Sequence, residues 1–214
     1  MSEEKDYKLE DIIAEFSEDT GSYTLKSVPK EEKRPAGAEL FEWLQMVLVC
    51  VLGAVIAFNL VVRLSVVDGQ SMDPTLEHGE LMLVWSLGYS PKQGDIVIVN
   101  KTIARGFLHE QAIVKRVIAL GGQTVDIDYG EGVVYVDGEA LDEDYILEEM
   151  YLPGNPYMQE THFEVPEGEV FVLGDNRNGS TDSRDDRLGT IHEDYVLGRA
   201  VCAIWPVGKI GLIG

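Results

Sequence analysis

The sequence has few basic residues, few cysteines and no recognisable metal-binding pattern. Its 214 residues include 17 lysines and arginines against 38 aspartates and glutamates. Nucleic-acid phosphates need a basic surface, so this balance argues against a nucleic-acid partner. The two cysteines, Cys50 and Cys202, form no Cys-x-x-Cys pair, which argues against a zinc site and a disulfide framework. The four histidines show no ligand spacing, so we expect no metal and no other cofactor.

Charge is also absent from one long stretch. Residues Trp43 to Val62 read WLQMVLVCVLGAVIAFNLVV. As a helix rising 1.5 Å per residue, this run would span a bilayer core of about 30 Å. The alternative is a buried helix of a soluble protein, but such helices rarely run this long without a charge. A cleaved signal peptide fits less well, because the preceding polar region is long and no Ala-x-Ala site follows. We therefore expect one transmembrane helix over residues 43–63.

The residues on either side of this segment predict its orientation. Residues 1–42 are polar and acidic, and we expect them to be largely disordered. Lys26, Lys30, Lys33 and Arg34 lie closest before the apolar run. Arg63 alone follows it closely. The positive-inside rule then places the N-terminus in the cytoplasm and residues from about 64 outside the cell membrane, with the lipid bilayer as a partner.

Residues 64–214 change to short β-type runs separated by turn-forming residues, and no long helical period appears there. The expected strands are Leu81–Trp85, Asp95–Val99, Ile113–Ile118, Thr124–Ile127, Val133–Val136, Glu169–Leu173 and Val196–Ile204. Asp137-Gly138, directly after one of these runs, predicts a hairpin turn. We expect a mainly β domain built of antiparallel strands in more than one sheet.

Ser71 lies just after the apolar segment, between a Gly-Gln step and a Pro-Thr turn. Pro74 fixes its own φ and biases Asp73 towards extended backbone, which keeps the chain after Ser71 out of a helix. A serine in this setting is most often a turn residue. It becomes a candidate nucleophile if a base lies near it in the fold.

Lys115 is the candidate for that base. It stands beside Arg116 in the apolar run 112–120. In a strand these two side chains point to opposite faces, so at most one faces solvent if the other faces inward. An inward lysine among valines and isoleucines is desolvated, and a fall of about three units in its pKa would leave it substantially neutral near pH 7.5. The alternative is an edge-strand lysine whose amine reaches solvent.

A third polar cluster follows the expected strand Glu169–Leu173. Residues 174–184 read GDNRNGSTDSR. Short polar side chains that bond the neighbouring backbone make such a loop rigid, as the support of a catalytic site needs to be. The alternative is a solvated turn with surface ion pairs of little energetic weight.

Together these stretches resemble the type I signal peptidases, the membrane-bound Ser/Lys leader peptidases of bacteria. The resemblance covers the apolar segment and nearly all of residues 64–214. Four motifs occur in the family order: Ser71-Met72-x-Pro74-Thr75, Gly94-Asp95-Ile96-Val97, Lys115-Arg116-Val117-Ile118 and Gly174-Asp175-Asn176-Arg177-x-x-Ser180-x-Asp182-Ser183-Arg184. The resemblance implies a largely β catalytic domain with a variable insertion within about residues 121–168, short as in the Gram-positive members.

The resemblance also implies roles for single residues. Ser71 corresponds to the nucleophile, Lys115 to the general base and Ser180 to the residue that orients the lysine amine. Asp182 and Arg184 correspond to a structural ion pair. The implied activity is the removal of N-terminal signal peptides from exported preproteins at small-x-small sites, through an acyl-enzyme and without a cofactor.

One position departs from many Gram-negative members, which have a serine two residues before the nucleophile. That serine hydroxyl helps to form the oxyanion hole, whereas this chain has Gly69. The hole is then expected to use the Ser71 backbone N–H, with another backbone donor or a water. A substrate would bind as an added strand, with Val67 and Val114 lining the pockets for alternate side chains.

Two other functions fit part of the sequence. A self-cleaving Ser-Lys peptidase of the SOS-repressor type shares the β core, but it would need a DNA-binding N-terminal domain in place of the acidic tail and apolar segment. A membrane-tethered β module could instead bind extracellular peptides without cleaving them. Incubation with a synthetic signal-peptide substrate, followed by mass spectrometry, separates these possibilities.

Overall fold

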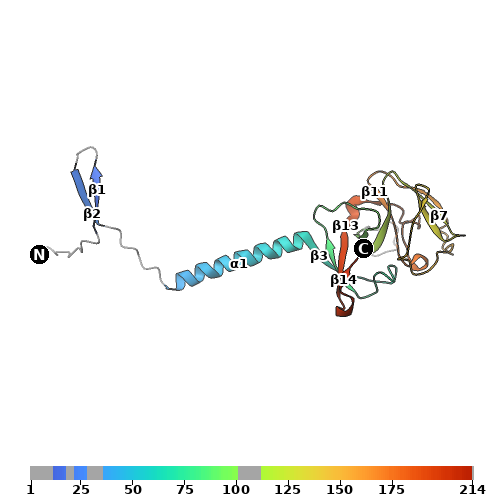
Figure 1. Ribbon diagram of the computed structural model, residues 1–214, viewed down its shortest axis with the longest axis horizontal. Helices are drawn as coiled ribbons and strands as arrows, with labels where there is room; N and C mark the ends of the chain where they lie inside the picture. Colours follow the sequence, from blue (N-terminus) through green and yellow to red (C-terminus); the bar gives the residue numbers. More distant parts are fainter. Residues whose placement is uncertain (1–11, 18–21, 28–35, 101–111, 214) are drawn as a thin grey trace. The chain divides into compact units, whose positions relative to one another are not determined.

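The computed structural model describes residues 12–17, 22–27, 36–100 and 112–213 (Figure 1). The chain divides into two units, residues 1–53 and 54–214, with the boundary inside a helix. In the first unit, β1 (Ile12–Ser17) and β2 (Ser22–Ser27) pair antiparallel. Our expectation of a largely disordered tail therefore does not hold for these two segments. Polar and apolar residues alternate along β2, and this period of two favours a strand.

Helix α1 (Ala36–Val61) begins before the expected segment and ends slightly earlier, because Val62 and Arg63 belong to the next strand. Residues 36–42 include good helix formers, and Glu39 in the first turn complements the helix dipole. The helix is therefore longer than the uncharged run from which we predicted it. Within the described residues it is the one helix long and apolar enough to cross a membrane, with a candidate span at Gly37–Ile56.

The second unit is built on an eight-stranded antiparallel sheet in the order β12-β11-β6-β5-β13-β4-β3, with β14 paired to β13 (Figure 1). Its strands are β3 (Val62–Val66), β4 (Leu81–Trp85), β5 (Ile96–Val99), β6 (Ile113–Leu120), β11 (Glu169–Leu173), β12 (Ile191–His192), β13 (Val196–Trp205) and β14 (Gly211–Leu212). Within the described residues they are accompanied by three 3-10 helices: η2 (Arg177–Gly179), η3 (Glu193–Tyr195) and η4 (Val207–Lys209).

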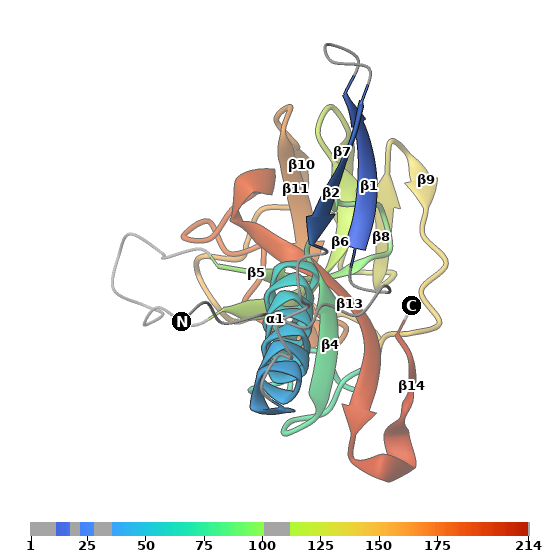
Figure 2. The same cartoon turned by 90° about the vertical axis from the view of Figure 1, so that its left-hand side faces the viewer.

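A smaller four-stranded sheet has the order β10-β7-β8-β9 (Figure 2). Its strands are β7 (Thr124–Asp128), β8 (Val133–Val136), β9 (Glu139–Ala140) and β10 (His162–Glu164). They lie between β6 and β11 in the sequence, within the insertion predicted over residues 121–168. The structure thus confirms a mainly β fold of antiparallel sheets with a small β insertion and one N-terminal apolar helix.

The seven strands expected from the sequence are all present, and their ends differ by no more than a residue or two. Four strands of two or three residues were too short to give a pattern: β9, β10, β12 and β14. Strand β3 was missed because it continues the apolar run of the helix without a turn signal.

Strand β6 lies inside the domain, and its residues 115–119 are all buried. Apolar clusters cover the large sheet, one of them around Met72, Leu76 and Met82 and another around Val117 and Val172. Because both faces of β6 are covered, its two adjacent cations are held away from solvent. This burial positions the site described next.

Candidate active site

Ser71 lies in the loop between β3 and β4. The Val67 N–H donates to the Glu80 carbonyl at 2.8 Å, and the Gly79 N–H donates to the Val67 carbonyl at 2.9 Å, so the loop is closed at its base. The side chains of Met72 and Leu76 are buried in the core. They fix the backbone on either side of the cis Asp73–Pro74 peptide and hold Ser71 half-buried.

The structure brings Ser71 and Lys115 together. Lys115 Nζ, from β6, lies 2.7 Å from Ser71 Oγ and also donates to the Val114 carbonyl at 2.9 Å. Lys115 is 3% exposed. A hydroxyl and an amine at this distance can exchange a proton directly.

The surroundings of Lys115 favour its neutral form. Burial lowers the pKa of the amine to about 8, while the carboxylates of Asp182 and Asp175 act in the opposite direction and the Arg184 guanidinium adds to the lowering. Desolvation therefore outweighs two nearby negative charges. A substantial neutral fraction exists at mildly alkaline pH, where the amine can act as a base.

Ser180 lies close to Ser71 without a hydrogen bond to Lys115. A Cβ added at Gly174 would clash with Ser180 Oγ and with the Ser71 carbonyl oxygen, so these groups crowd around the end of β11. Ser180 Oγ is buried and has no hydrogen-bond partner among the described residues. Its role in orienting Lys115 stays a prediction.

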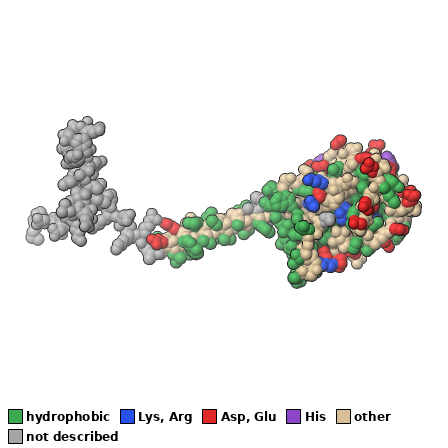
Figure 3. Space-filling model, viewed as in Figure 1, with side chains coloured by type: hydrophobic (Ala, Val, Ile, Leu, Met, Phe, Trp, Pro, Cys, Tyr) green, Lys and Arg blue, Asp and Glu red, His purple; other side chains and the backbone are tan. Residues whose placement is uncertain are grey.

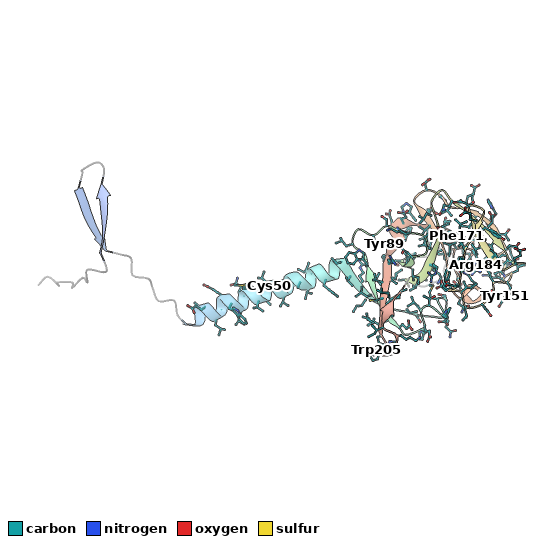
Figure 4. The ribbon with its side chains drawn as sticks, in the orientation of Figure 1. Cys50, Tyr89, Tyr151, Phe171, Arg184 and Trp205 are labelled. Carbon is teal, nitrogen blue, oxygen red and sulfur yellow. The ribbon has the colours of Figure 1, made fainter. Side chains whose placement is uncertain are left out.

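Asp182 and Arg184 form a fully buried ion pair near Ser71 and Lys115. Arg184 Nε and Nη2 donate to the Asp182 carboxylate at 2.8 and 2.9 Å. Burial alone would raise the pKa of Asp182, but the guanidinium and the Gly174 N–H hold it below its usual value. Arg184 Nη2 also donates to the Arg177 carbonyl at 2.6 Å. Figure 4 shows Arg184 within the domain, whereas Trp205 stands at its edge.

A second buried ion pair, to which no sequence pattern assigned a role, joins Arg116 to Asp175 beside Lys115. Arg116 Nε and Nη2 donate to the Asp175 carboxylate at 2.8 and 2.7 Å, and Thr75 Oγ1 donates to the same group at 2.5 Å. Lys115 and Arg116 do point to opposite faces of β6, yet both are buried because both faces are covered. The sequence motifs contain both Arg116 and Asp175. The motifs do not reveal the pairing, because it is a contact between distant parts of the chain.

The remaining predicted positions lie around the same loop. Val67 is buried in the core cluster that contains Met72, and Val114 packs against that cluster. The Gly69 N–H donates to His78 Nδ1 at 3.1 Å, so it is engaged within the protein. His109 lies outside the described residues. Among those that the structure describes, no group of three or more histidines, cysteines and acidic residues could hold a metal ion.

A serine hydroxyl beside a buried amine, on a scaffold of antiparallel sheets, defines a candidate acyl-transfer site of the hydrolase class. Comparison with known proteins agrees with this class. The family described as signal peptidase, peptidase S26, matches residues 40–205, and the chain belongs to that family of serine peptidases. Members of the family remove signal peptides.

Individual relatives carry the same description. A probable signal peptidase I-1 from Synechocystis is 38% identical over 69% of this chain and 74% of its own length. A probable signal peptidase I-2 from the same organism is 33% identical over 91% of this chain and 86% of its own length. A crystal structure of a signal peptidase I from Enterococcus faecalis is 30% identical, covers 53% of this chain and 98% of its own, and gives a TM-score of 0.42.

Proposed function

We propose that this chain is a membrane-anchored endopeptidase that removes N-terminal signal peptides from preproteins with a Ser71–Lys115 dyad and an acyl-enzyme. The observation that carries the proposal is the 2.7 Å separation between Lys115 Nζ and Ser71 Oγ, with the lysine almost fully buried. A serine needs a base to become a nucleophile, and a desolvated lysine can be that base without a histidine.

In the first half of the reaction, neutral Lys115 removes the proton of Ser71 Oγ while that oxygen attacks the scissile carbonyl carbon. The resulting oxyanion takes a hydrogen bond from the Ser71 N–H, which donates none within the described residues. The Lys115 ammonium then gives its proton to the leaving amine as the C–N bond breaks. A water repeats these steps on the ester, which releases the signal peptide and restores the hydroxyl and the neutral amine.

The edge of β6 offers a place for an extended substrate. On one side, β6 pairs with β5 from Ile113 to Arg116. On the other side, its pairing with β11 begins at Arg116, opposite Leu173, so residues 113–115 have no neighbouring strand there within the described structure. A substrate strand can add at this edge next to the Ser71 loop. Its alternate side chains then meet the half-buried Val114, whose wall favours small residues, whereas Val67 is buried in the core cluster that contains Met72.

Exposed apolar side chains on the second unit support a location at the membrane surface. Exposed large apolar side chains lie on four strands that are neighbours in the large sheet, namely Leu64, Val66, Trp85, Trp205 and Leu212. Figure 3 shows hydrophobic side chains gathered over β3 and β14 and acidic side chains over the region of β7. Exposed apolar patches with tryptophan suit the lipid–water interface. Together with α1 and the basic residues before it, this supports a single-pass anchor with a cytoplasmic N-terminus.

Mass spectrometry of a cleavage reaction tests the proposal. Full-length protein in detergent micelles is incubated with a synthetic signal peptide that ends in Ala-x-Ala and continues into mature sequence. We expect a single cut after the second alanine and an ester adduct on Ser71 when the reaction is quenched with acid. Binding of the peptide without cleavage would instead favour a peptide-binding module.

A further inference from the structure

Asp175 is a buried carboxylate whose hydrogen bonds join separate parts of the site. It accepts two hydrogen bonds from Arg116, the neighbour of Lys115 in β6, and one from Thr75 in the Ser71 loop. Its side chain is completely buried. Since a paired buried carboxylate is costly to move, Asp175 fixes the Ser71 loop relative to β6.

The Arg116 guanidinium is held in turn by Tyr145, which belongs to the insertion. The guanidinium carbon lies 3.8 Å from the centre of the Tyr145 ring, a stacking arrangement that attracts the cation. Arg116 Nη1 donates to the Gly94 carbonyl at 3.0 Å. Burial, and then the charge of Glu143, raise the pKa of the Tyr145 phenol, so the ring stays neutral over the working range. The ring therefore covers one face of a guanidinium whose edge is hydrogen-bonded.

Glu143, from the same segment, holds a second arginine. Arg177 Nη1 donates to Glu143 Oε2 at 2.8 Å, and a further hydrogen bond joins Arg177 Nη2 to the same carboxylate. The Tyr145 hydroxyl donates to Glu143 Oε1 at 2.9 Å, which links the two side chains of the insertion. Arg177 Nε donates to the Gly174 carbonyl at 3.1 Å. Glu143 thus fixes the loop that follows β11.

The loop after β11 contacts the Ser71 loop directly. The Asn176 N–H donates to the Ser71 carbonyl at 3.1 Å, and Asn176 Nδ2 donates to the Gln70 carbonyl at 3.1 Å. From the other side, the Leu147 N–H donates to the Asp175 carbonyl at 3.2 Å. A displacement of residues 174–177 would therefore move the backbone of Ser71.

We infer that Tyr145 and Glu143 are positioning residues for signal-peptide cleavage, which hold Arg116 and Arg177 so that Asp175 and Asn176 keep the Ser71 loop in register with Lys115. This inference rests on the proposed function. The insertion then contributes to catalysis although Tyr145 and Glu143 do not touch the reacting atoms. They act through the two arginines, which hold Asp175 and Asn176.

The position of Asp175 also affects the base. The charged groups that act on Lys115 are Asp182 and Asp175, which raise its pKa, and Arg184, which lowers it, with the paired Arg116 adjacent in β6. If the ring and the glutamate are lost, Asp175 is less firmly tied to Arg116 and can approach the lysine amine. The amine then holds its proton to a higher pH, and the acidic limb of the activity profile moves in the same direction.

The test measures kcat and KM for a signal-peptide substrate from about pH 6 to about pH 10, with full-length protein in detergent micelles. For Tyr145→Leu we expect a fall of at least about tenfold in kcat, a smaller change in KM and an acidic limb moved to higher pH. Tyr145→Phe keeps the ring over Arg116 and should stay within about threefold of wild type. Glu143→Gln should move the limb in the same direction as Tyr145→Leu, and it keeps the test open if the leucine variant fails to fold.

A double-mutant cycle tests the route of the effect. Thr75→Val removes the hydroxyl that donates to Asp175 with little change in volume. If Tyr145 acts through Asp175, the losses caused by Thr75→Val and Tyr145→Leu are not additive. Additive losses from two folded variants would overturn this route.

Tyr135→Leu is the matched control, because Tyr135 also belongs to the insertion and its hydroxyl donates to a glutamate, Glu131, at 3.3 Å. We expect this variant to match wild type. The inference alone is overturned if folded Tyr145→Leu and Glu143→Gln keep wild-type kcat and the wild-type acidic limb, or if Tyr135→Leu has the same effect as Tyr145→Leu. A wild-type chain that cleaves no signal peptide overturns the proposed function and this inference with it.

Discussion

Lys115 Nζ lies 2.7 Å from Ser71 Oγ although the two residues are 44 positions apart in the chain. Strand β6 supplies the lysine and the loop after β3 supplies the serine. The core holds both, since Met72 is buried next to Ser71 and all the neighbours of Lys115 on its strand from Arg116 to Ala119 are buried. Desolvation and proximity thus have the same structural origin, and each leads to predictions.

Removal of either partner of the dyad should abolish catalysis without unfolding the domain. We expect Ser71→Ala and Lys115→Ala each to lower kcat/KM for a preprotein by at least about a thousandfold, as loss of a nucleophile or its base does elsewhere. Thermal melting checks that the variants fold. Lys92→Ala, at an exposed lysine in the loop before β5, is the control and should keep full activity. An active Lys115→Ala variant would refute the lysine as base.

The activity should depend on pH through Lys115. Burial lowers the pKa of its amine to about 8, and only the deprotonated amine can accept the serine proton. The value of kcat/KM should therefore rise about tenfold per pH unit below this pKa, reach half its maximum near pH 8 and level off above it. A midpoint near 6.5 would point to a histidine instead.

Much of the fold was predictable because its signals are local. Alternating or continuous apolar runs between turn formers located β4, β8 and β11 at their observed bounds. The end of the helix was not predictable in this way. Residues 61 and 62 are both valine, so the sequence does not separate helix from strand there. Val62 is a strand residue because it pairs with Trp85 on β4.

The residues of the candidate site were visible in the sequence, but their contacts were not. An inward lysine in an apolar strand is visible from the sequence alone, and so is a serine held in a turn. The partner of Arg116 is not visible, because Asp175 lies 59 positions away and the pair forms only when β11 docks on β6. Tyr145 gave no signal either, since one aromatic residue in an acidic segment has no period.

Lys115→Met should stabilise the protein at neutral pH. The folded-state pKa of about 8 lies below the ordinary 10.5, so the unfolded chain binds the proton more tightly than the folded chain does. Below pH 8 the amine is protonated in both states. The protonated lysine then destabilises the fold by about 3 kcal/mol, and this penalty disappears as pH rises from 8 towards 10.5. Thermal melting of the full-length protein in detergent should give a higher Tm for Lys115→Met at about pH 7, with a smaller gap at about pH 10.

That prediction has a matched control in Lys92→Met, which replaces an exposed lysine and should leave the Tm unchanged at both pH values. If Lys115→Met melts below wild type at neutral pH, the lysine contributes more through packing than it loses through desolvation. The low pKa would then have no measurable effect on stability.

Gly174→Ala should inactivate the enzyme through crowding alone. A Cβ at this position would clash with Ser180 Oγ and the Ser71 carbonyl oxygen, both part of the closely packed site. The Ser71 loop would have to shift, and a displacement of about 1 Å at reacting atoms costs about a hundredfold in rate. Gly208→Ala is the control, because an added Cβ there meets nothing within 4 Å. We expect kcat/KM and the Tm to fall for Gly174→Ala, which crowds a closely packed site, and both to stay unchanged for Gly208→Ala. Full activity of Gly174→Ala would show that the end of β11 can move away from the nucleophile without loss of function.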